Sequence, residues 1–223
     1  MDFLVSRIAE TGSTNDDLAA AAQLGAPHGS VLVTDHQTTG KGRLGRTWTA
    51  PPGSNLLVSV LFREDIETPH RLVQLVSVAM AEAIETVSPT RPVLKWPNDL
   101  LVGDAKLAGV LAQAGGTANR IDWVVVGIGV NVGWAPEGGA RVEHTTPPLL
   151  FDAWLPRLGL DDDIDQRYRA RLYTLGRSVR VEAPNETFVG IASDVLADGR
   201  LVVTNESGQR IVGVGDVTHL RHT

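Results

Sequence analysis

The sequence contains no cysteine. Disulfide bonds, thiolate nucleophiles, thiolate zinc sites and cysteine-held iron–sulfur clusters are therefore excluded. Long hydrophobic runs are also missing: the richest apolar window, residues 72–84, is interrupted by Gln74 and Glu82, whereas a membrane-spanning helix needs about 20 predominantly apolar residues. Arg7 stands where the apolar core of a signal peptide would have to run. We expect a soluble, cytoplasmic protein.

Positive charge is in the minority. The chain has 20 lysines and arginines against 26 aspartates and glutamates, a formal net charge of −6, which argues against general nucleic-acid binding. Its charged fraction of 21% and its hydrophobic fraction of 43% are ordinary for a globular protein. A chain of 223 residues has room for one large domain, or for one domain with a small appendage.

Acidic residues are absent from one stretch, residues 36–63. Its segment TTGKGRLGRTWTAPPGSN, residues 38–55, has the glycines and prolines of a loop. Backbone N–H groups of such a loop can approach an anion closely while cationic side chains neutralise it. We therefore expect a binding site for a phosphate or a carboxylate. The cations of the stretch are Lys41, Arg43, Arg46 and Arg63.

Hydrophobic periodicity predicts an α/β segment followed by an all-β segment. The polar start and alanine-rich middle of residues 12–25 predict one helix, and apolar residues at helical spacing predict another at 70–87. After a glycine- and proline-rich loop at 134–148 we expect two short helices, the second at 164–175. Strands are expected at 4–9, 30–35, 55–62, 92–96, 100–102, 106–112 and 122–131.

From residue 178 onward the sequence consists of short β-rich pieces. They are divided by Pro184-Asn185, Asp198-Gly199 and Ser207-Gly208, which are typical of hairpin turns. Five such pieces predict a small barrel. We therefore divide the chain into a first domain at residues 1–175 and a second domain at residues 176–223.

Two nucleotide-binding patterns are rejected on context. Residues 40–45, GKGRLG, match G-x-G-x-x-G, but a dinucleotide fingerprint opens a helix, and this segment leads into RTWTAPPG. A P-loop would need Ser or Thr after Lys41, where Gly42 stands. The six histidines show no metal-ligand spacing.

The segment LKWPNDLLVGDAKLAGVL, residues 94–111, contains a corner and a strand. Pro97 excludes helix and strand geometry around it, so Asn98 and Asp99 project from a fixed turn. Lys106 stands where an apolar strand resumes after a tight turn at residues 103–104. Because a buried lysine is costly unless it meets an anion, we expect its ammonium to point inward toward a binding site.

The segment VVVGIGVNVG, residues 124–133, predicts a buried strand. Gly127 and Gly129 remove side chains from one face of that strand, which permits the close approach of a flat group. Asn131 lies on the same face. The three segments together predict a glycine-lined sheet floor, an anion-binding loop above it and an inward lysine.

Four motifs carry a resemblance to one family. GSTND (12–16), HQTTGKGRLGRTW (36–48), KWPNDLL…KLAGVL (95–111) and GIGVNV (127–132) resemble the catalytic-domain motifs of biotin protein ligases in order and spacing. The resemblance implies an α+β fold, in which a mixed sheet packed with helices forms a class II synthetase-like catalytic domain and a small SH3-like β-barrel follows it. It also implies an enzyme that converts biotin and MgATP to biotinyl-5′-AMP and pyrophosphate, then passes biotin to a lysine of a biotin carboxyl carrier protein domain. A homodimer through an exposed edge of the catalytic sheet is a further expectation.

The resemblance also implies roles for individual residues. Lys106 would bridge the biotin carboxylate and the α-phosphate, with Arg43 and Lys41 completing the catalytic set. Trp48 would stack near the adenine, and Asp99 would face the metal. The implied biotin site consists of Ser13, Thr14, Asn15, Gln37, Gly40, Lys41, Gly42, Arg43, Lys106, Gly109, Gly127 and Gly129. The implied ATP site consists of Arg43, Arg46, Trp48, Asn98, Asp99, Lys106 and Asn131.

Three departures from the family pattern are present. The usual Gly-Arg-Gly-Arg loop has Lys41 in place of its first arginine, which keeps the charge but loses the planar fork. Few residues precede the GSTND motif, so we expect no winged-helix domain and no operator binding, which a gel shift with this chain would test. The segment 133–177 is shorter than usual, which predicts reduced helices near the barrel.

Two alternatives stay open at this point. Lipoate-protein ligases share the catalytic architecture and the adenylation logic, although their loop signatures differ from GKGRLGRTW. The other alternative is a non-catalytic module that binds biotin or a nucleotide, in which Lys106 would have no catalytic task.

We predict that Lys41→Arg slows the release of biotinyl-AMP by up to about tenfold. A guanidinium can make two hydrogen bonds to a carboxylate or phosphate, whereas an ammonium acts as a point charge. The release rate of radiolabelled adenylate from the natural protein and from the variant would check this. Equal or slower release from the natural protein would contradict it.

Overall fold

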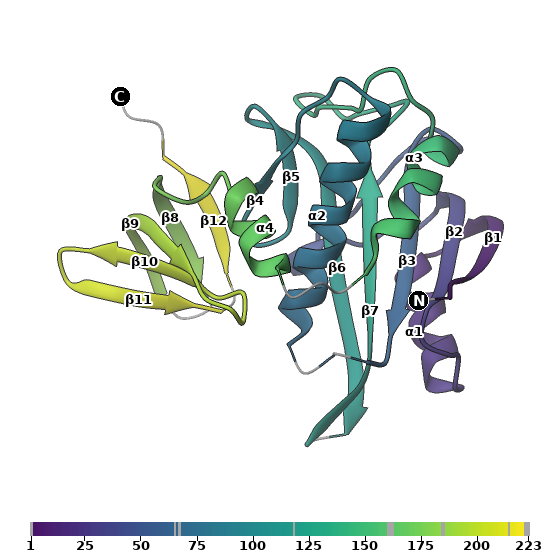
Figure 1. Ribbon diagram of the computed structural model, residues 1–223, viewed down its shortest axis with the longest axis horizontal. Helices are drawn as coiled ribbons and strands as arrows, with labels where there is room; N and C mark the ends of the chain where they lie inside the picture. Colours follow the sequence, from purple (N-terminus) through teal and green to yellow (C-terminus); the bar gives the residue numbers. More distant parts are fainter. Residues whose placement is uncertain are drawn as a thin grey trace.

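A computed structural model describes residues 2–64, 66, 68–117, 119–159, 163–183, 186–213 and 215–220. Two sheets organise the chain (Figure 1): a seven-stranded sheet covered by helices, and a five-stranded sheet formed by the C-terminal segment. Within the described residues, no helix is both long and apolar enough to cross a bilayer.

The seven-stranded sheet is mixed, as the sequence predicts. β1 and β2 run parallel, and the other neighbouring strands are antiparallel. The strand order is β1-β2-β3-β7-β6-β5-β4. The strands are β1 (Leu4–Thr11), β2 (Ser30–Gln37), β3 (Leu56–Phe62), β4 (Val93–Lys95), β5 (Asp99–Val102), β6 (Ala105–Thr117) and β7 (Arg120–Val130).

Helices cover the two faces of this sheet unequally. α2 (Pro69–Val87) packs on one face with α3 (Pro147–Trp154) and α4 (Ile164–Arg171), while the short α1 (Thr14–Gln23) packs on the other. Because side chains alternate along a strand, Val124 and Val126 of β7 join the α2 core, and Trp123 and Val125 join α1. At about 1.5 Å per residue, a helix as short as α1 covers only part of its face. The uncovered part carries the candidate site.

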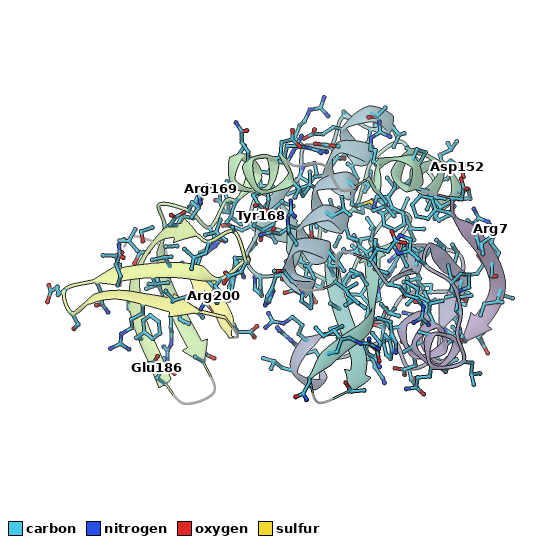
Figure 2. All side chains as sticks on the ribbon, turned by 60° about the horizontal axis from the view of Figure 1, so that its bottom comes forward. Arg7, Asp152, Tyr168, Arg169, Glu186 and Arg200 are labelled. Carbon is cyan, nitrogen blue, oxygen red and sulfur yellow. The ribbon has the colours of Figure 1, made fainter. Side chains whose placement is uncertain are left out.

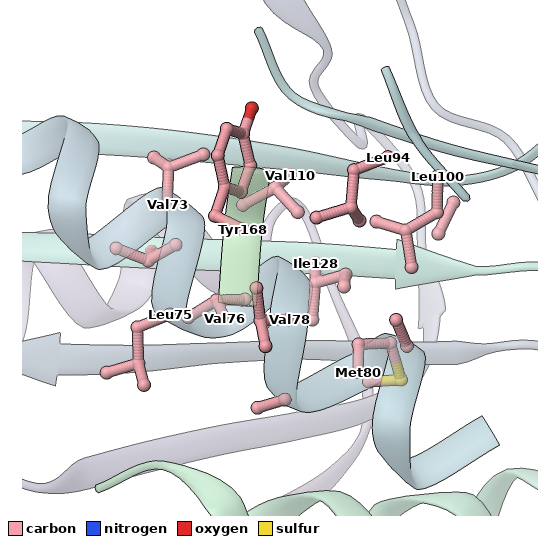
Figure 3. Close-up of a cluster of buried hydrophobic side chains, with 14 of the residues drawn as sticks. Val73, Leu75, Val76, Val78, Met80, Leu94, Leu100, Val110, Ile128 and Tyr168 are labelled. Carbon is pink, nitrogen blue, oxygen red and sulfur yellow. The ribbon is translucent and has the colours of Figure 1, made fainter. Parts of the chain in front are cut away.

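Helix α2 supplies the centre of the main core (Figure 3). Its side chains lie above Val110 of β6 and Ile128 of β7, and Tyr168 of α4 reaches the same cluster. The helical spacing of its apolar residues is confirmed, because every predicted inward residue is fully buried. These residues are Leu72, Leu75, Val76, Ala79, Met80, Ala83 and Ile84.

Two helix boundaries differ from the sequence prediction. α4 ends at Arg171 rather than at residue 175, because the chain then turns to β4, where the Tyr173 N–H donates to the Leu94 carbonyl at 2.8 Å. α3 begins at Pro147, which the sequence pattern places in the preceding loop. A proline in the first turn of a helix loses no hydrogen bond, since the N–H groups there have no partner within the helix.

The C-terminal sheet contains the five strands that the sequence predicts. Their order is β11-β10-β9-β8-β12, with antiparallel pairing throughout. Gly199 and Gly208 turn with φ of 83° and 112° at two predicted hairpins. The expected turn at Pro184-Asn185 lies outside the described residues, and the domain boundary after residue 175 stays a prediction. The strands are β8 (Ser178–Ala183), β9 (Glu186–Val195), β10 (Leu201–Asn205), β11 (Gly208–Val212) and β12 (Asp216–His219).

The two sheets share one hydrophobic core and are joined by hydrogen bonds. The buried Trp96 donates its Nε1–H to the Gly199 carbonyl at 2.9 Å, and its backbone N–H donates to Thr174 Oγ1 at 3.0 Å. Figure 2 shows Arg169 of α4 beside the barrel, where it pairs with Asp194 of β9. The five-stranded sheet, which we call the barrel, is therefore docked against the seven-stranded sheet rather than tethered by a free linker.

Candidate active site

A cavity of about 300 Å³ opens on the α1 face of the seven-stranded sheet. The start of α1, the glycine-rich loop, the corner between β4 and β5, and the middle of β6 and β7 form its walls. Of the residues that the sequence assigns to biotin or ATP, Gly40 and Asp99 are not part of the lining. The predicted residues that line it are Ser13, Thr14, Asn15, Gln37, Lys41, Gly42, Arg43, Arg46, Trp48, Asn98, Lys106, Gly109, Gly127, Gly129 and Asn131.

Sequence reasoning missed some of the lining. Strand pairing brings several of these residues beside the predicted glycines, as with Leu111 opposite Gly127, and single-sequence patterns do not give that pairing. Pro136 comes from the loop at 134–148, and no local signal marks it as a site residue. The missed lining residues are Thr47, Thr49, Val58, Val110, Leu111, Ile128 and Pro136.

The floor of the cavity is glycine backbone. Gly109 and Gly129 lie opposite each other on β6 and β7. The indole of Trp48 rests on Gly129, where an added Cβ would lie 2.6 Å from Trp48 Cε2. A flat group therefore does approach this face closely, as the glycine spacing predicts. Trp48 Nε1 is buried there without a hydrogen-bond partner among the described residues.

Uncharged polar groups line one end of the cavity. Gln37 Oε1 accepts hydrogen bonds from the backbone N–H and the hydroxyl of Thr14, at 2.8 and 3.0 Å. Asn15 Nδ2 donates to the Leu111 carbonyl at 3.0 Å, and Asn15 Oδ1 lies 2.6 Å from Ser59 Oγ. Buried polar groups need such partners, so this network fixes the orientation of Thr14 and Asn15. Sequence reasoning missed the fully buried Ser59. A lone serine in the apolar run LLVSVLF is the pattern that could have indicated a polar residue of the site.

The other end of the cavity is cationic. Lys106 Nζ lies 2.7 Å from Asp99 Oδ1 and 5.8 Å from the centroid of the Trp48 ring. The inward direction predicted for Lys106 is confirmed, because the side chain lines the cavity. It is nevertheless 43% exposed, so the ammonium keeps part of its hydration in addition to one carboxylate partner.

Arg43 and Arg46 reach the cationic end from the glycine-rich loop. Arg43 donates to Asn98 Oδ1 at 3.3 Å and to the Gly215 carbonyl at 3.2 Å. Arg46 donates to Asp216 Oδ1 at 3.0 Å. Burial lowers the pKa of Arg43, and the nearby Asp216 carboxylate opposes that shift. Gly215 and Asp216 precede and begin β12 of the barrel, and sequence reasoning missed both because no local pattern marks them.

The glycine-rich loop forms a compact turn. The Gly42 N–H donates to the Arg46 carbonyl at 2.7 Å, and only a short 3-10 turn, Arg43–Gly45, follows the first glycines. The rejection of a dinucleotide fingerprint is therefore confirmed, because no α-helix opens here. Lys41 Nζ lies 2.6 Å from Asp16 Oδ2, so this ammonium is held at the start of α1. Its predicted catalytic role stays a prediction.

Asn131 is buried, with its amide already bonded. Its Nδ2 donates to the Lys106 carbonyl at 3.3 Å and to the Ala140 carbonyl at 3.0 Å, and its Oδ1 accepts from Asn55 Nδ2 at 3.3 Å. Its place in the ATP site stays a prediction. These bonds use both amide hydrogens, whereas Oδ1 accepts only one bond and has a second lone pair.

Comparisons with known proteins agree in pointing to one family. The model of the Biotin/lipoate A/B protein ligase family matches residues 8–131, and that of the Biotin protein ligase C terminal domain matches residues 174–220. The biotin–[acetyl-CoA-carboxylase] ligase of Mycobacterium tuberculosis is 36% identical over 249 residues, covering 96% of this chain and 88% of the relative. The bifunctional ligase/repressor BirA of Bacillus subtilis is 29% identical over 230 residues, covering 92% of this chain and 70% of the relative.

Solved structures show the same fold. The biotin protein ligase of Aquifex aeolicus in complex with biotin and ATP superposes with a TM-score of 0.82 at 23% identity, covering 98% of this chain and 99% of that one. The biotin protein ligase of Leishmania major in complex with biotinyl-5-AMP gives a TM-score of 0.63 at 19% identity, with 98% of both chains covered.

We predict that Gly127→Ala lowers the free energy of unfolding by about 1–3 kcal/mol. The new methyl group would fall on Asn15 Oδ1 and approach Ser59 Oγ to 3.0 Å, so the polar network would have to shift. Urea denaturation would measure this. The control is Gly42→Ala, whose added Cβ would have no neighbour closer than 3.4 Å. Equal stability of the Gly127 variant and the natural protein would contradict the prediction.

Proposed function

This chain belongs to the Biotin/lipoate A/B protein ligase family, and we infer from that premise that it is a biotin protein ligase. It activates biotin with ATP to form biotinyl-5′-AMP and pyrophosphate. It then transfers biotin to a lysine of a biotin carboxyl carrier protein domain. The observation that carries this assignment is the two-ended cavity, which has uncharged hydrogen-bonding groups at one end and a lysine with two arginines at the other.

The ureido group of biotin matches the uncharged end of the cavity, and its carboxylate matches the cationic end. Its ureido group is neutral and both donates and accepts hydrogen bonds, as do Ser13, Thr14 and Gln37 at the uncharged end. Its carboxylate is an anion at the far end of an apolar chain. With the ureido group at Thr14, the chain would lie beside the side chains of Asn15 and Trp48, which rest on Gly127 and Gly129, and bring the carboxylate to the cations. The indole of Trp48 lies on that same backbone, so it can cover the chain or the adenine.

Adenylation requires two anions to meet. A carboxylate oxygen of biotin attacks the α-phosphorus of ATP, and the bond from that phosphorus to the β-bridging oxygen breaks to release pyrophosphate. Lys106 and Arg43 would offset the charge that develops on the α-phosphate, and Arg46 would hold the outer phosphates. Preorganised cations in a partly dehydrated site are worth more than in water because they need no reorientation during the reaction. The backbone of residues 40–43 would close over the carboxylate.

Transfer of biotin needs an amine at the cationic end. The lysine nitrogen of the carrier domain attacks the acyl carbon of biotinyl-AMP, the bond to the phosphate oxygen breaks, and AMP leaves. Asn98 lines the cavity at this end, and Asp99 pairs with Lys106 there. Asp99 lies outside the cavity lining, and its pair with Lys106 supports the proposal that it accepts a proton from the incoming amine.

Mg²⁺ is proposed to arrive with ATP. Among the described residues, no three acidic or histidine side chains gather into a metal site. Mg²⁺ commonly binds through one or two carboxylates together with substrate phosphates and water, so the single carboxylate of Asp99 fits this mode. When bound, the ion would neutralise part of the charge on the phosphates.

A homodimer is proposed through the edge of β6. β5 pairs with β6 only as far as Gly109, and Asn98 bonds both backbone groups of Val110, so the part of this long strand beyond Val110 presents an edge on the β5 side. Unpaired backbone groups at a sheet edge favour pairing with a second strand. Sedimentation equilibrium would test this, and a monomer at every protein concentration would contradict it.

The alternatives raised from the sequence are not favoured. Lipoate-protein ligases belong to the same broad family, but this chain also matches the biotin ligase C-terminal domain at residues 174–220, and its similar relatives along the full length carry the biotin ligase name. A non-catalytic module is not favoured either, because the same relatives are named as ligases.

We predict that the chain catalyses ATP–pyrophosphate exchange that depends on biotin, and that Lys106→Ala lowers the exchange rate by about 100-fold or more. Loss of one preorganised charge at a developing anion commonly costs a factor of about 10²–10³. The assay would follow labelled pyrophosphate entering ATP, with lipoate substituted for biotin in parallel.

Each outcome of this assay decides between the candidate functions. Exchange with lipoate alone would move it to the lipoate ligases. No exchange with either acid would refute the enzyme assignment, and full activity of Lys106→Ala would remove this residue from the mechanism. Arg91→Gln is the matched control, because Arg91 bonds only to the Ser88 and Thr90 carbonyls in the described hydrogen bonds and is not part of the cavity lining.

A further inference from the structure

Two arginines of the glycine-rich loop converge on one carboxylate oxygen of the barrel. Asp216 Oδ1 lies 3.0 Å from Arg46 NH2 and 3.9 Å from Arg43 NH1. The two arginines are also linked to each other, since Arg46 Nε donates to the Arg43 carbonyl at 3.1 Å. Paired guanidinium groups that meet at one anionic oxygen are a typical arrangement for binding phosphate. Asp216 therefore lies where an anionic ligand of these arginines would lie.

Arg43 has other contacts that hold it in place. It donates to Asn98 Oδ1 and to the Gly215 carbonyl, at 3.3 and 3.2 Å. It is only 18% exposed, and Arg46 lowers its pKa further by like-charge repulsion. Removal of the Asp216 charge would therefore leave Arg43 oriented toward the cavity, with Asp99 as the remaining carboxylate that acts on it.

We propose that Asp216 is an internal counter-anion that occupies the polyphosphate position between Arg43 and Arg46. The phosphates of ATP displace it on binding, and its return after adenylation helps to expel pyrophosphate. This inference rests on the proposed function, since it assigns these arginines to the phosphates. Asp216 acts through the arginines and is a positioning residue rather than a catalytic one.

Asp216 is expected to weaken the binding of anions to Arg43 and Arg46. An internal competitor occupies the anion site for part of the time. The apparent dissociation constant of the anionic ligand then equals its intrinsic value divided by the fraction of molecules in which the site is free. The pair is partly exposed, with Asp216 at 34% and Arg46 at 59%, so solvent screens it and the interaction is weak. A weak internal pair of this kind corresponds to an increase of about threefold to fivefold. That increase is small enough for ATP to overcome and large enough to speed product release.

The test is the affinity for pyrophosphate, measured by isothermal titration calorimetry on the full chain without biotin or metal. We expect Asp216→Asn to bind pyrophosphate about threefold to fivefold more tightly than the natural protein, and Asp216→Glu to restore the natural affinity. Asn is isosteric with Asp, and Asp216→Ser is a second neutral variant in case the first one does not fold. Thermal unfolding would verify the fold of each variant.

Asp194→Asn is the matched control. Asp194 is another barrel carboxylate that pairs with an arginine of the larger domain, Arg169, and both partners are partly exposed, at 43% and 45%. Its printed arginine partner is Arg169, whereas Asp216 pairs with Arg43 and Arg46 of the glycine-rich loop, so neutralisation of Asp194 should leave pyrophosphate affinity unchanged. An equal gain in both variants would show a general effect of net charge and would overturn the proposal.

The remaining outcomes also decide the proposal. Unchanged or weaker pyrophosphate binding by Asp216→Asn would overturn it, because the carboxylate would then not compete for the arginines. Biotin affinity, measured in the same way, should not change in this variant. Failure of the natural protein to bind biotin would refute the proposed function, while the pyrophosphate comparison would still decide whether Asp216 competes with anions.

Discussion

Contact between side chains and bare backbone at Gly127 and Gly129 is the constraint on which the site depends. Asn15 packs on the first glycine and Trp48 on the second. A side chain on either glycine would lift these groups off the sheet and disconnect the floor from α1 and from the loop. The short α1 leaves this strip of sheet uncovered, so the same packing that closes the α1 core also creates the cavity.

The cations of the site are balanced by carboxylates from separate parts of the fold. Lys41 pairs with Asp16 of α1, Lys106 with Asp99 of β5, and Arg46 with Asp216 of β12. A protein with a net charge of −6 can therefore hold a cluster of cations on a flexible glycine-rich segment without strong repulsion among them. An anionic ligand must replace these carboxylates as the partner of the cations. This favours a ligand that carries several negative charges, because it can replace several carboxylates at once.

Local sequence patterns could predict the elements and most of the site. The spacing of apolar residues located α2, because its burial depends on neighbours three and four positions apart, and the glycine alternation located the floor of β7. The patterns could not predict that α4 ends at Arg171, because the hydrogen bond that ends it goes to Leu94 of a distant strand. Gly215 and Asp216 were missed for the same reason, since their partners Arg43 and Arg46 lie about 170 positions earlier in the chain.

The position of Asp216 on the last strand has a consequence during synthesis. The glycine floor, Lys106 and the arginine loop have all left the ribosome before β12 is made, and the first sheet already has its helices by then. Until β12 pairs with β8, Arg43 and Arg46 have neither the Gly215 carbonyl nor the Asp216 carboxylate as partners. In a nascent chain Lys41 can already pair with Asp16 of α1, whereas Arg43 and Arg46 gain these two partners only when β12 folds.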